Sequence, residues 1–365
     1  MKYVFYDFMQ VPGGAERVTL ALAKALDAQV LVSRVEPACE ALLESQGIPV
    51  QAVSKSWTRG LGRVLEAIVS FSGWAGRIAQ AETVIYSGFY APLAVHFQRA
   101  GRRIYYCHTI PRFAYDLKAE SRSAFAWYLR PFLDVFTALL RWRFERAIRQ
   151  MDAVWVNSIN VQQRLKRYLG VEAQVIYPPV ETQRFAWASD GDAYVSLARL
   201  EPLKRVELVV QAFMQMPHRR LVVVSGGSQS VHLQAMAQGA QNISFAGWVS
   251  EAQLQAIVGQ ARAAIYVPVD EDFGMSPVEA MAAGKPVIGV AEGGLLETIV
   301  HGQTGWLIEG ELTPEKIKSA VDSLEALNPA AMRAACEAQA MKFDGAGFAQ
   351  RIQQELAKVN PDGRN

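Results

Sequence analysis

The sequence is short of the features that mark secreted, disulfide-bonded and membrane-spanning proteins. It has three cysteines, and the wide spacing of Cys39, Cys107 and Cys336 fits neither a disulfide framework nor a zinc motif. No run of uninterrupted apolar residues reaches the roughly 18 that a membrane-spanning helix needs. The first ten residues, MKYVFYDFMQ, place Asp7 within the apolar part and offer no small-residue cleavage site, unlike a secretory leader. We therefore expect a protein of the reducing cytoplasm.

Motifs of several functional classes are also missing. No G-x-G-x-x-G follows a predicted strand, which disfavours a nicotinamide-binding domain. The chain has no internal repeat, no low-complexity tract and no recognised nucleic-acid module, so nucleic acid is not an expected partner. The acidic stretch 270–279 contains no histidine and lacks the spacing of a calcium loop. We expect no metal.

The charge is divided unevenly along the chain, although the net charge is only +2. Residues 1–180 contain 22 Lys and Arg against 14 Asp and Glu, a difference of +8, whereas residues 181–365 contain 15 against 21, a difference of −6. An asymmetry of this size indicates that the first half faces something anionic, such as an acidic lipid surface.

Short apolar runs separated by helix-like stretches indicate two α/β domains. A chain of 365 residues exceeds the size at which a single core usually stops growing. The runs have the character of buried parallel strands, and they form two series on either side of the turn-rich connector 175–185. They are 3–8, 28–33, 83–88, 102–108 and 153–158, then 193–200, 220–227, 243–248, 263–268 and 286–294. We predict two doubly wound domains, 1–180 and 181–344.

Two segments could hold phosphate groups. Gly13 and Gly14 precede a predicted helix, whose first N–H groups attract anions, although such a turn is also a common structural joint. In the stretch LARLEPLKR, Arg199 and Lys204 lie at a strand end and the following helix start, where they could clamp a diphosphate. The alternative is a solvated loop in which Lys204 and Arg205 only balance Glu201 and Glu207.

The stretch VPVDEDFGMSPVEAMAAGKPVIGVAEGG, residues 267–294, combines carboxylates with glycine turns. We expect a helix from about Pro277 with Ser276 as its N-cap, which places Glu279 near the helix start. Glu271 projects from the preceding loop, and Gly274 leaves the backbone open to close approach. Carboxylates accept hydrogen bonds, so this arrangement suits the hydroxyl groups of a sugar or ribose.

These segments resemble a known family. EDFGMSPVEAMAAGKPVIGVAEGGLLETIVHGQTGWL is similar to the donor-site signature of the family-4 retaining glycosyltransferases, in which seven residues separate two glutamates. LARLEPLKRVELVVQAF resembles the diphosphate-binding segment of that family, and FMQVPGGAERV resembles its first glycine loop. The resemblance implies a GT-B fold, with two Rossmann-like domains facing across a cleft. Domain 1–180 would lie on the acceptor side, with a C-terminal helix at 345–360 packing back on it.

The resemblance also implies roles for individual residues. Glu279 would bind the ribose, Glu271 would hold hydroxyls of the sugar, and Arg199 and Lys204 would neutralise the diphosphate of a nucleotide-sugar donor, without a metal or other cofactor. His108, Arg199, Lys204 and Glu271 are the implied catalytic residues. The implied donor-binding residues are Gly13, Gly14, Arg199, Lys204, Gly226, Val249, Glu271, Phe273, Gly274, Met275, Ser276 and Glu279.

The segment YYCHTIPRFAYD, residues 105–116, bears on the sugar. A histidine at a strand end is more often packed than catalytic, but in this family a histidine here lines the sugar pocket. The segment also resembles the His-Thr-Pro-x-Arg-Tyr run of bacterial O-antigen mannosyltransferases, with Ile110, Pro111 and Phe113 as departures. This likeness implies GDP-mannose as donor and an acceptor of lipopolysaccharide assembly, either a saccharide or a polyprenyl-diphosphate-linked one. Arg112 and Asp116 are the candidate acceptor residues.

Two aromatic, arginine-containing stretches, 56–77 and 124–150, have two interpretations. In 124–150, Phe125, Tyr128, Leu129, Phe132, Phe136, Leu139 and Leu140 recur at helical spacing. They could form a core helix pair, or a basic amphipathic surface on the inner face of the cytoplasmic membrane. For the function, two alternatives to transfer are a nucleotide-sugar epimerase on the same two-domain plan and a non-catalytic nucleotide-sugar-binding protein.

Overall fold

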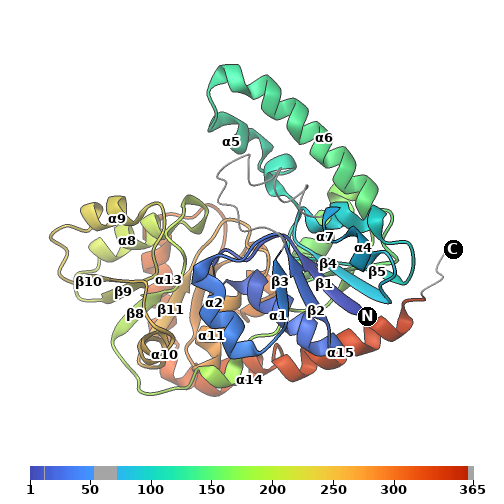
Figure 1. Cartoon of the computed structure of the whole chain (residues 1–365). Coiled ribbons are helices and arrows are strands. Elements are labelled where there is room, and N and C mark those ends of the chain that lie inside the picture. Colours follow the sequence, from blue (N-terminus) through green and yellow to red (C-terminus); the bar gives the residue numbers. More distant parts are fainter. Residues whose placement is uncertain (12, 53–71, 361–365) are drawn as a thin grey trace. The chain divides into compact units, whose positions relative to one another are not determined.

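The computed structural model describes residues 1–11, 13–52 and 72–360, and the chain divides into two compact units (Figure 1). Unit 1 comprises Met1–Pro178 together with Phe348–Asn365, and unit 2 comprises Pro179–Gly347. Each unit has its own parallel sheet, with helices connecting successive strands. Two Rossmann-like units of this kind are characteristic of the GT-B fold, so the predicted fold class is confirmed.

The sheet of unit 1 has seven strands in the order β3-β2-β1-β4-β5-β6-β7. Their bounds are β1 Lys2–Tyr6, β2 Gln29–Val32, β3 Val50–Ala52, β4 Thr83–Ser87, β5 Arg102–Cys107, β6 Ala153–Val156 and β7 Gln174–Val175. Helix α1 (Gly14–Leu26) follows β1, and α7 (Ile159–Leu169) follows β6. The edge strands β3 and β7 were not predicted, because three and two residues are too few to show a strand pattern.

The sheet of unit 2 has six strands in the order β10-β9-β8-β11-β12-β13. The strands are β8 Ala193–Ser196, β9 Arg220–Val224, β10 Ile243–Gly247, β11 Ala263–Tyr266, β12 Val287–Val290 and β13 Gly305–Ile308. The helices are α8 Val206–Met214, α9 Ser230–Met236, α10 Glu251–Gly259, α11 Met275–Ala282, α12 Leu295–Thr298, α13 Pro314–Ala326 and α14 Arg333–Met341. The strand order reverses at β8 and β11, which is where ligands bind in sheets of this type.

The last helix, α15 (Gly345–Lys358), contributes to the packing of unit 1. The ring of Phe348 lies edge-on to Tyr106 of β5 with a centroid distance of 6.4 Å, within the roughly 4.5–7 Å typical of aromatic pairs. Arg102 Nε donates a hydrogen bond of 2.8 Å to the carbonyl of Val359, and Ile352 is fully buried. Helix α15 therefore packs into the hydrophobic core of unit 1.

Unit 1 also carries a helical projection formed by α5 (Lys118–Ser123), the 3-10 turn η4 (Trp127–Leu129) and α6 (Arg130–Ile148) (Figure 1). The buried residues of α6 all lie in its C-terminal part, from Thr137 onwards. Phe132 and Leu139 are 75% and 53% exposed. The core-helix interpretation therefore holds only for the C-terminal part of α6. Residues 53–71 of the other aromatic stretch lie outside the described residues.

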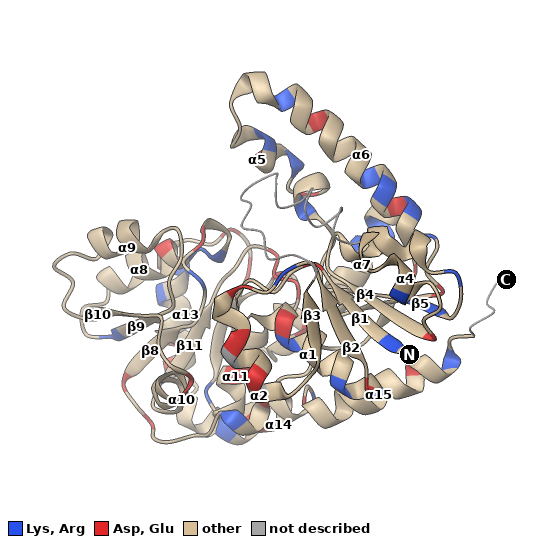
Figure 2. Ribbon diagram, viewed as in Figure 1, with Lys and Arg blue, Asp and Glu red and all other residues tan. Residues whose placement is uncertain are grey.

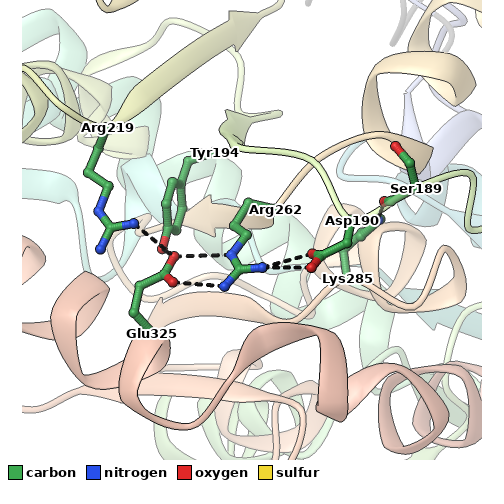
Figure 3. Close-up of polar contacts among 7 residues, drawn as sticks. All are labelled: Ser189, Asp190, Tyr194, Arg219, Arg262, Lys285 and Glu325. Atoms are coloured by element: carbon green, nitrogen blue, oxygen red, sulfur yellow. Dashed lines mark hydrogen bonds and ion pairs between the residues drawn. The ribbon is translucent and has the colours of Figure 1, made fainter.

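Ion pairs hold the amino ends of the strands in unit 2 (Figure 3). Glu325 of α13 accepts hydrogen bonds from Arg262 Nη2 at 2.8 Å and from the Tyr194 hydroxyl at 2.6 Å, and Arg219 lies 3.4 Å away. Arg262 Nη1 also donates to both carboxylate oxygens of Asp190 at 2.9 Å. Because Arg219 and Arg262 directly precede β9 and β11, this cluster lies at the amino edge of the sheet.

Candidate active site

The predicted donor-binding residues of unit 2 follow four neighbouring strands. Arg199 and Lys204 come after β8, Gly226 after β9, Val249 after β10, and residues 271–279 after β11. The carboxyl ends of parallel strands meet at one edge of the sheet, which is where an α/β domain binds its ligand. The structure thus gathers this part of the predicted set along a single edge.

Lys204 lies at the centre of a small polar cluster at this edge. Its Nζ donates to Glu271 Oε2 at 2.6 Å and to the Tyr266 hydroxyl at 3.1 Å. The Lys204 and Glu271 side chains are 20% and 18% exposed. Burial, followed by the charges of Glu271 and Glu279, raises the pKa of Tyr266 well above its ordinary value, so the phenol stays protonated. Glu271 and Glu279 therefore both lie close enough to Tyr266 to affect its pKa. The sequence had not indicated this tyrosine as a site residue.

Arg205 holds the Lys204 segment against the loop after β11. Its backbone adopts a left-handed conformation, with φ of 52°, immediately before α8. Nε donates to the carbonyl of Val267 at 2.7 Å, and Nη2 donates to the Pro268 carbonyl and to Glu292 Oε2, the latter at 3.0 Å. Arg205 is a positioning residue that sequence reasoning missed, because a long-range guanidinium contact leaves no local pattern.

The interpretation of Lys204 and Arg205 as charges that only balance Glu201 and Glu207 is wrong, since both pair instead with glutamates beyond β11. Glu201 accepts hydrogen bonds from the hydroxyl and backbone N–H of Ser228, at 2.5 and 3.1 Å. These bonds lower the pKa of Glu201, and the nearby Arg199 guanidinium adds a smaller effect in the same direction. The side chain of Arg199 is exposed at the same edge of the sheet.

The loop after β11 turns into α11 at Gly274. The φ of Gly274 is +90°, and an added Cβ would lie 2.8 Å from Leu295 Cδ2, so both conformation and space require glycine. Gly274 is the N-cap and α11 begins at Met275, so the prediction of a start near Pro277 with a Ser276 cap is wrong. The positive φ makes glycine the capping residue. Met275 and Ser276 therefore occupy the first turn, whose backbone N–H groups point out of the helix start.

A second glycine turn supports this loop. The Gly294 N–H donates to the Glu271 carbonyl at 2.7 Å, and a Cβ on Gly294 would lie 2.4 Å from the Phe273 Cα. Phe273 is 2% exposed, and its ring packs edge-on against Phe343 at 5.2 Å. A donor contact at Phe273 would therefore come from its backbone. Glycine at position 294 thus lets the loops that follow β11 and β12 touch.

Gly226 and Val249 lie beside Trp248, another residue that the sequence analysis did not select. A Cβ on Gly226 would lie 2.4 Å from the indole Nε1 of Trp248, which is 72% exposed. The Gly226 carbonyl accepts a hydrogen bond of 3.0 Å from the Leu200 N–H. A side chain at position 226 would therefore displace the indole from its present position.

In unit 1, His108 follows β5 and is held by its neighbours. Its Nε2 lies 2.7 Å from the hydroxyl oxygen of Ser87, the last residue of β4. The rings of Tyr6 and Tyr106 pack edge-on at 6.2 and 5.2 Å. Burial lowers the pKa of His108 to about 4. The imidazole is therefore neutral at physiological pH, suited to hydrogen bonding rather than to carrying charge.

Asp7 organises the backbone beside His108. Its carboxylate accepts N–H bonds from Phe89 at 2.6 Å, Tyr90 at 2.9 Å and Ala91 at 2.6 Å. Burial raises the pKa of Asp7 to about 7, against the opposing effect of these three bonds. Gly88, with φ of +104°, is needed because a Cβ would lie 2.6 Å from the Asp7 Cγ. Asp7 therefore fixes the loop that follows Ser87.

The glycine turn at the start of α1 is partly filled by a side chain of the same helix. Gly13 is the N-cap and Gly14 the first helical residue. A Cβ on Gly13 would lie 2.9 Å from Glu16 Oε2, and the Tyr6 hydroxyl donates to Glu16 Oε1 at 3.4 Å. The buried carboxylate of Glu16 thus lies in the positive field of the helix start, the field predicted to attract a phosphate.

The candidate acceptor residues form a pair. Arg112 Nε donates to Asp116 Oδ2 at 2.8 Å, and the two side chains are 15% and 17% exposed. Arg164 lies 3.9 Å from the same oxygen and donates to the Thr109 hydroxyl at 2.9 Å. This arrangement ties the segment after His108 to α7. In the described part of the chain, no group of three or more His, Cys, Asp or Glu side chains could hold a metal ion.

Two family profiles match successive parts of the chain. The profile described as Glycosyltransferase Family 4 matches residues 12–184, and the profile described as Glycosyl transferases group 1 matches residues 180–343. The chain belongs to glycosyltransferase family 4. It is therefore an enzyme, and neither the epimerase nor the non-catalytic binding protein is retained.

Individual relatives of this family 4 glycosyltransferase are distant. Human alpha-1,3/1,6-mannosyltransferase ALG2 is 25% identical over 416 residues, covering 95% of this chain and 93% of that protein. D-inositol 3-phosphate glycosyltransferase from Mycobacterium sp. strain JLS is 28% identical over 189 residues, covering 46% of this chain and 43% of that protein. The crystal structure of HepE from Anabaena in complex with UDP-glucose superposes with a TM-score of 0.77 at 21% identity, covering 98% and 100%. This last similarity shows the fold.

Proposed function

We propose that this enzyme transfers a mannosyl group from GDP-mannose to a saccharide acceptor, with retention of anomeric configuration and without a metal ion. The observation that carries the choice of mannose is the alignment with ALG2 over 95% of the chain. The likeness of the segment from His108 to Arg112 to O-antigen mannosyltransferases supports the same sugar. That likeness also implies GDP-mannose as the activated form of the sugar, and therefore a guanine nucleotide in the donor.

In this proposal the cations at the carboxyl edge of unit 2 stabilise the leaving diphosphate. The bond to the anomeric carbon breaks as the acceptor hydroxyl attacks from the same face, and negative charge gathers on the departing phosphate. Preformed cations at that place lower the barrier, because they need no rearrangement as the charge develops. Lys204 has three N–H donors, and Glu271 and Tyr266 engage two of them. The third is the one that we assign to a phosphate oxygen, with Arg199 beside it.

The remaining residues of the site hold the donor. We assign Glu279 to the ribose, and Glu271 with the backbone of Gly274, Met275 and Ser276 to the sugar hydroxyls. His108 would face the sugar as a neutral hydrogen-bonding group, since its pKa of about 4 keeps it uncharged. The acceptor proton would leave to the departing phosphate, so this scheme needs no carboxylate nucleophile.

We further propose that the acceptor is carried on a polyprenyl diphosphate and that the enzyme works at the inner face of the cytoplasmic membrane, in assembly of a cell-surface polysaccharide such as lipopolysaccharide. The charge difference of +8 in residues 1–180 supports an anionic surface as partner of unit 1. Of the helices in the described residues, none combines the length and apolar character needed to cross a bilayer.

The donor assignment is tested by a thermal-shift screen of nucleotide sugars on the purified enzyme. GDP-mannose should raise the melting temperature more than UDP-glucose, UDP-galactose or ADP-glucose, because only a ligand that binds the native state stabilises it. A larger shift with UDP-glucose, the ligand named for HepE, would overturn GDP-mannose as donor. Product analysis by NMR then decides retention: an α-mannosidic linkage is expected, and a β-linkage contradicts the proposed mechanism.

A further inference from the structure

Helix α6 exposes a row of large apolar side chains to solvent. Phe132, Val135, Leu139 and Trp142 are 75%, 70%, 53% and 57% exposed. Their spacing of three and four residues places them on one face of the helix. We call these four residues the α6 stripe. Trp127 and Tyr128 in the preceding turn η4, 78% and 59% exposed, extend the exposed apolar surface beyond the start of the helix.

The α6 stripe is separate from the face by which the helix packs on unit 1. Leu140 and Phe144 are 5% and 0% exposed and, four residues apart, share the buried face of α6. The helix is thus apolar on two sides, of which unit 1 covers one. Contiguous exposed apolar surface of this kind marks a site of interaction with a partner or a membrane.

Basic residues follow the α6 stripe along the same helix. Arg143, Arg146 and Arg149 are all exposed, and the Arg146 guanidinium lies 5.9 Å from the Trp142 ring centroid. Residues 118–149 contain seven Lys and Arg against three Asp and Glu, a difference of +4. Figure 2 shows the blue of the basic residues concentrated towards the C-terminal end of α6, beyond the mostly tan stretch of the stripe.

We propose that the α6 stripe, together with Trp127 and Tyr128, inserts into the headgroup region of an anionic bilayer while Arg143, Arg146 and Arg149 contact lipid phosphates. Trp and Tyr are the residues that favour the membrane interface, and arginines beside an apolar face are typical of helices that lie on anionic lipid. This inference identifies the surface that would bind the membrane, and it rests on the membrane location given in the proposed function.

The charge argues for lipid over a second copy of the chain. Two copies that met through this surface would each bring the charge difference of +4 of residues 118–149 to the interface, and like charges oppose such an interface. A bilayer meets the cations with phosphates instead. At about 1.5 Å per residue, the stripe runs for roughly 15 Å and Arg146 lies roughly 6 Å beyond its end. The length of the face therefore suits a helix lying in the interface rather than crossing the bilayer.

Vesicle flotation of the full chain without any sugar substrate tests this surface. We expect the wild-type enzyme to float with vesicles of phosphatidylcholine and phosphatidylglycerol in equal amounts at low salt. The triple variant Phe132→Ser, Val135→Ser, Leu139→Ser should lose about tenfold or more in vesicle affinity, because it no longer buries apolar side chains in lipid. A matched control, Met214→Ser, Val231→Ser, Leu327→Ser, removes three exposed apolar side chains of unit 2 and should bind as the wild type does.

Several outcomes overturn the proposal. These are no flotation of the wild type at low salt, equal flotation of the stripe variant and its control, or a dimer in light scattering that the stripe substitutions convert to a monomer. Circular dichroism and melting temperature establish that each variant is folded, as expected for substitutions of exposed residues.

The cationic part has its own test. Arg143→Gln, Arg146→Gln, Arg149→Gln should weaken binding to anionic vesicles about tenfold at low salt and remove most of its salt dependence, whereas the matching Lys variants should retain both. Unchanged salt dependence in the Gln variant would refute the phosphate contact. Donor turnover with a soluble saccharide acceptor should be the same in all these variants. The two proposals can thus fail separately. Loss of vesicle binding would leave sugar transfer unchanged, and a wrong donor assignment would leave vesicle flotation unchanged.

Discussion

Unit 2 contains two groups of the same chemical kind at opposite edges of one sheet, each with a tyrosine, a glutamate and a cation. At the amino edge, Glu325 accepts hydrogen bonds from Tyr194 and Arg262 and forms an ion pair with Arg219 (Figure 3). Arg262 also donates a hydrogen bond to Asp190. At the carboxyl edge, Lys204 contacts Glu271 and Tyr266 and follows an exposed Arg199.

The difference lies in what surrounds the charges. Burial alone would raise the pKa of Glu325, but hydrogen bonds from Arg262 and Tyr194 bring it below its ordinary value, as in a saturated structural ion pair. The carboxyl-edge group instead lies beside glycine turns and the helix start at Gly274. Of the three N–H donors of Lys204, Glu271 and Tyr266 engage two. Residue type alone therefore does not separate a structural cluster from a functional one. We propose that position at the carboxyl edge of the sheet marks the functional cluster.

The largest effect should come from Lys204→Ala. We expect kcat to fall by about 10²–10³, because a preorganised donor to the developing phosphate charge is lost. The melting temperature should also fall, because Glu271, whose side chain is 18% exposed, loses its cation, so turnover is measured at a temperature at which the variant is folded. Steady-state kinetics with a verified donor measure this, with Lys316→Ala as a control at a surface lysine. Unchanged kinetics in Lys204→Ala would remove the residue from the mechanism.

Glu325→Ala should differ from Lys204→Ala in its effect on turnover. We expect it to lower the free energy of unfolding by about 3 kcal/mol, because it leaves Arg262 without its principal partner in a largely buried place. Turnover of the folded fraction should stay near the wild-type value. Urea denaturation and kinetics at low temperature check both statements. A loss of kcat in a stable variant would show that the amino-edge cluster takes part in function.

Glu279→Ala tests whether a second residue at the carboxyl edge acts in donor binding rather than in the chemical step. If Glu279 binds the ribose, its removal should raise KM for the donor by about 10- to 100-fold through loss of hydrogen bonds to a charged group, with a smaller change in kcat. Isothermal titration with the donor nucleotide checks it. An effect on kcat alone would instead place Glu279 at the reacting centre.

The two tyrosines allow the same change to be made at both edges. Tyr194→Phe removes the 2.6 Å bond to Glu325 and should cost about 1 kcal/mol of stability without affecting turnover. Tyr266→Phe removes the 3.1 Å contact to Lys204 and should lower kcat several-fold. Equal behaviour of the two variants in both assays would argue that the edges are not functionally different.

The smallest expected effect concerns His108 in unit 1. With a pKa of about 4 against an ordinary 6.5, the imidazole stays neutral from pH 6 to 8, so its NMR signal should not titrate in that range. Because the unfolded chain binds the proton more readily, the stability contributed by the neutral ring is complete above about pH 6.5 and is lost as the pH falls towards 4. His108→Gln should therefore reduce the acid sensitivity of stability, by on the order of 1 kcal/mol between pH 7 and 5. A ring that titrates near its ordinary pKa would contradict the burial argument.

Much of this architecture could be predicted from the sequence, because buried parallel strands and glycine turns leave local patterns. The central strands, the two-domain organisation and the gathering of the residues from Arg199 to Glu279 at one edge follow from such patterns. Other features depend on contacts between distant segments. Arg205, which follows β8, donates to the carbonyl of Val267 at the end of β11, 62 residues later in the sequence. Tyr266 stands out only through its contact with Lys204, which is equally distant in sequence.

The errors have equally specific physical causes. Ser276 is a favourable capping residue by type, but the left-handed φ at Gly274 starts the helix earlier. Helical spacing in 124–150 revealed an apolar helix, yet periodicity cannot say whether one or two faces are covered. The exposed fractions of Phe132 and Leu140, 75% and 5%, separate the two.

The contribution of α15 to the core of unit 1 has a consequence for biosynthesis. The segment from Phe348 onwards leaves the ribosome after all of unit 2, whereas its partners Tyr106 and Arg102 are made earlier. Part of the apolar surface of unit 1 therefore stays uncovered until residues 348–359 have been translated, and a nascent chain stopped before residue 348 should engage chaperones through that surface.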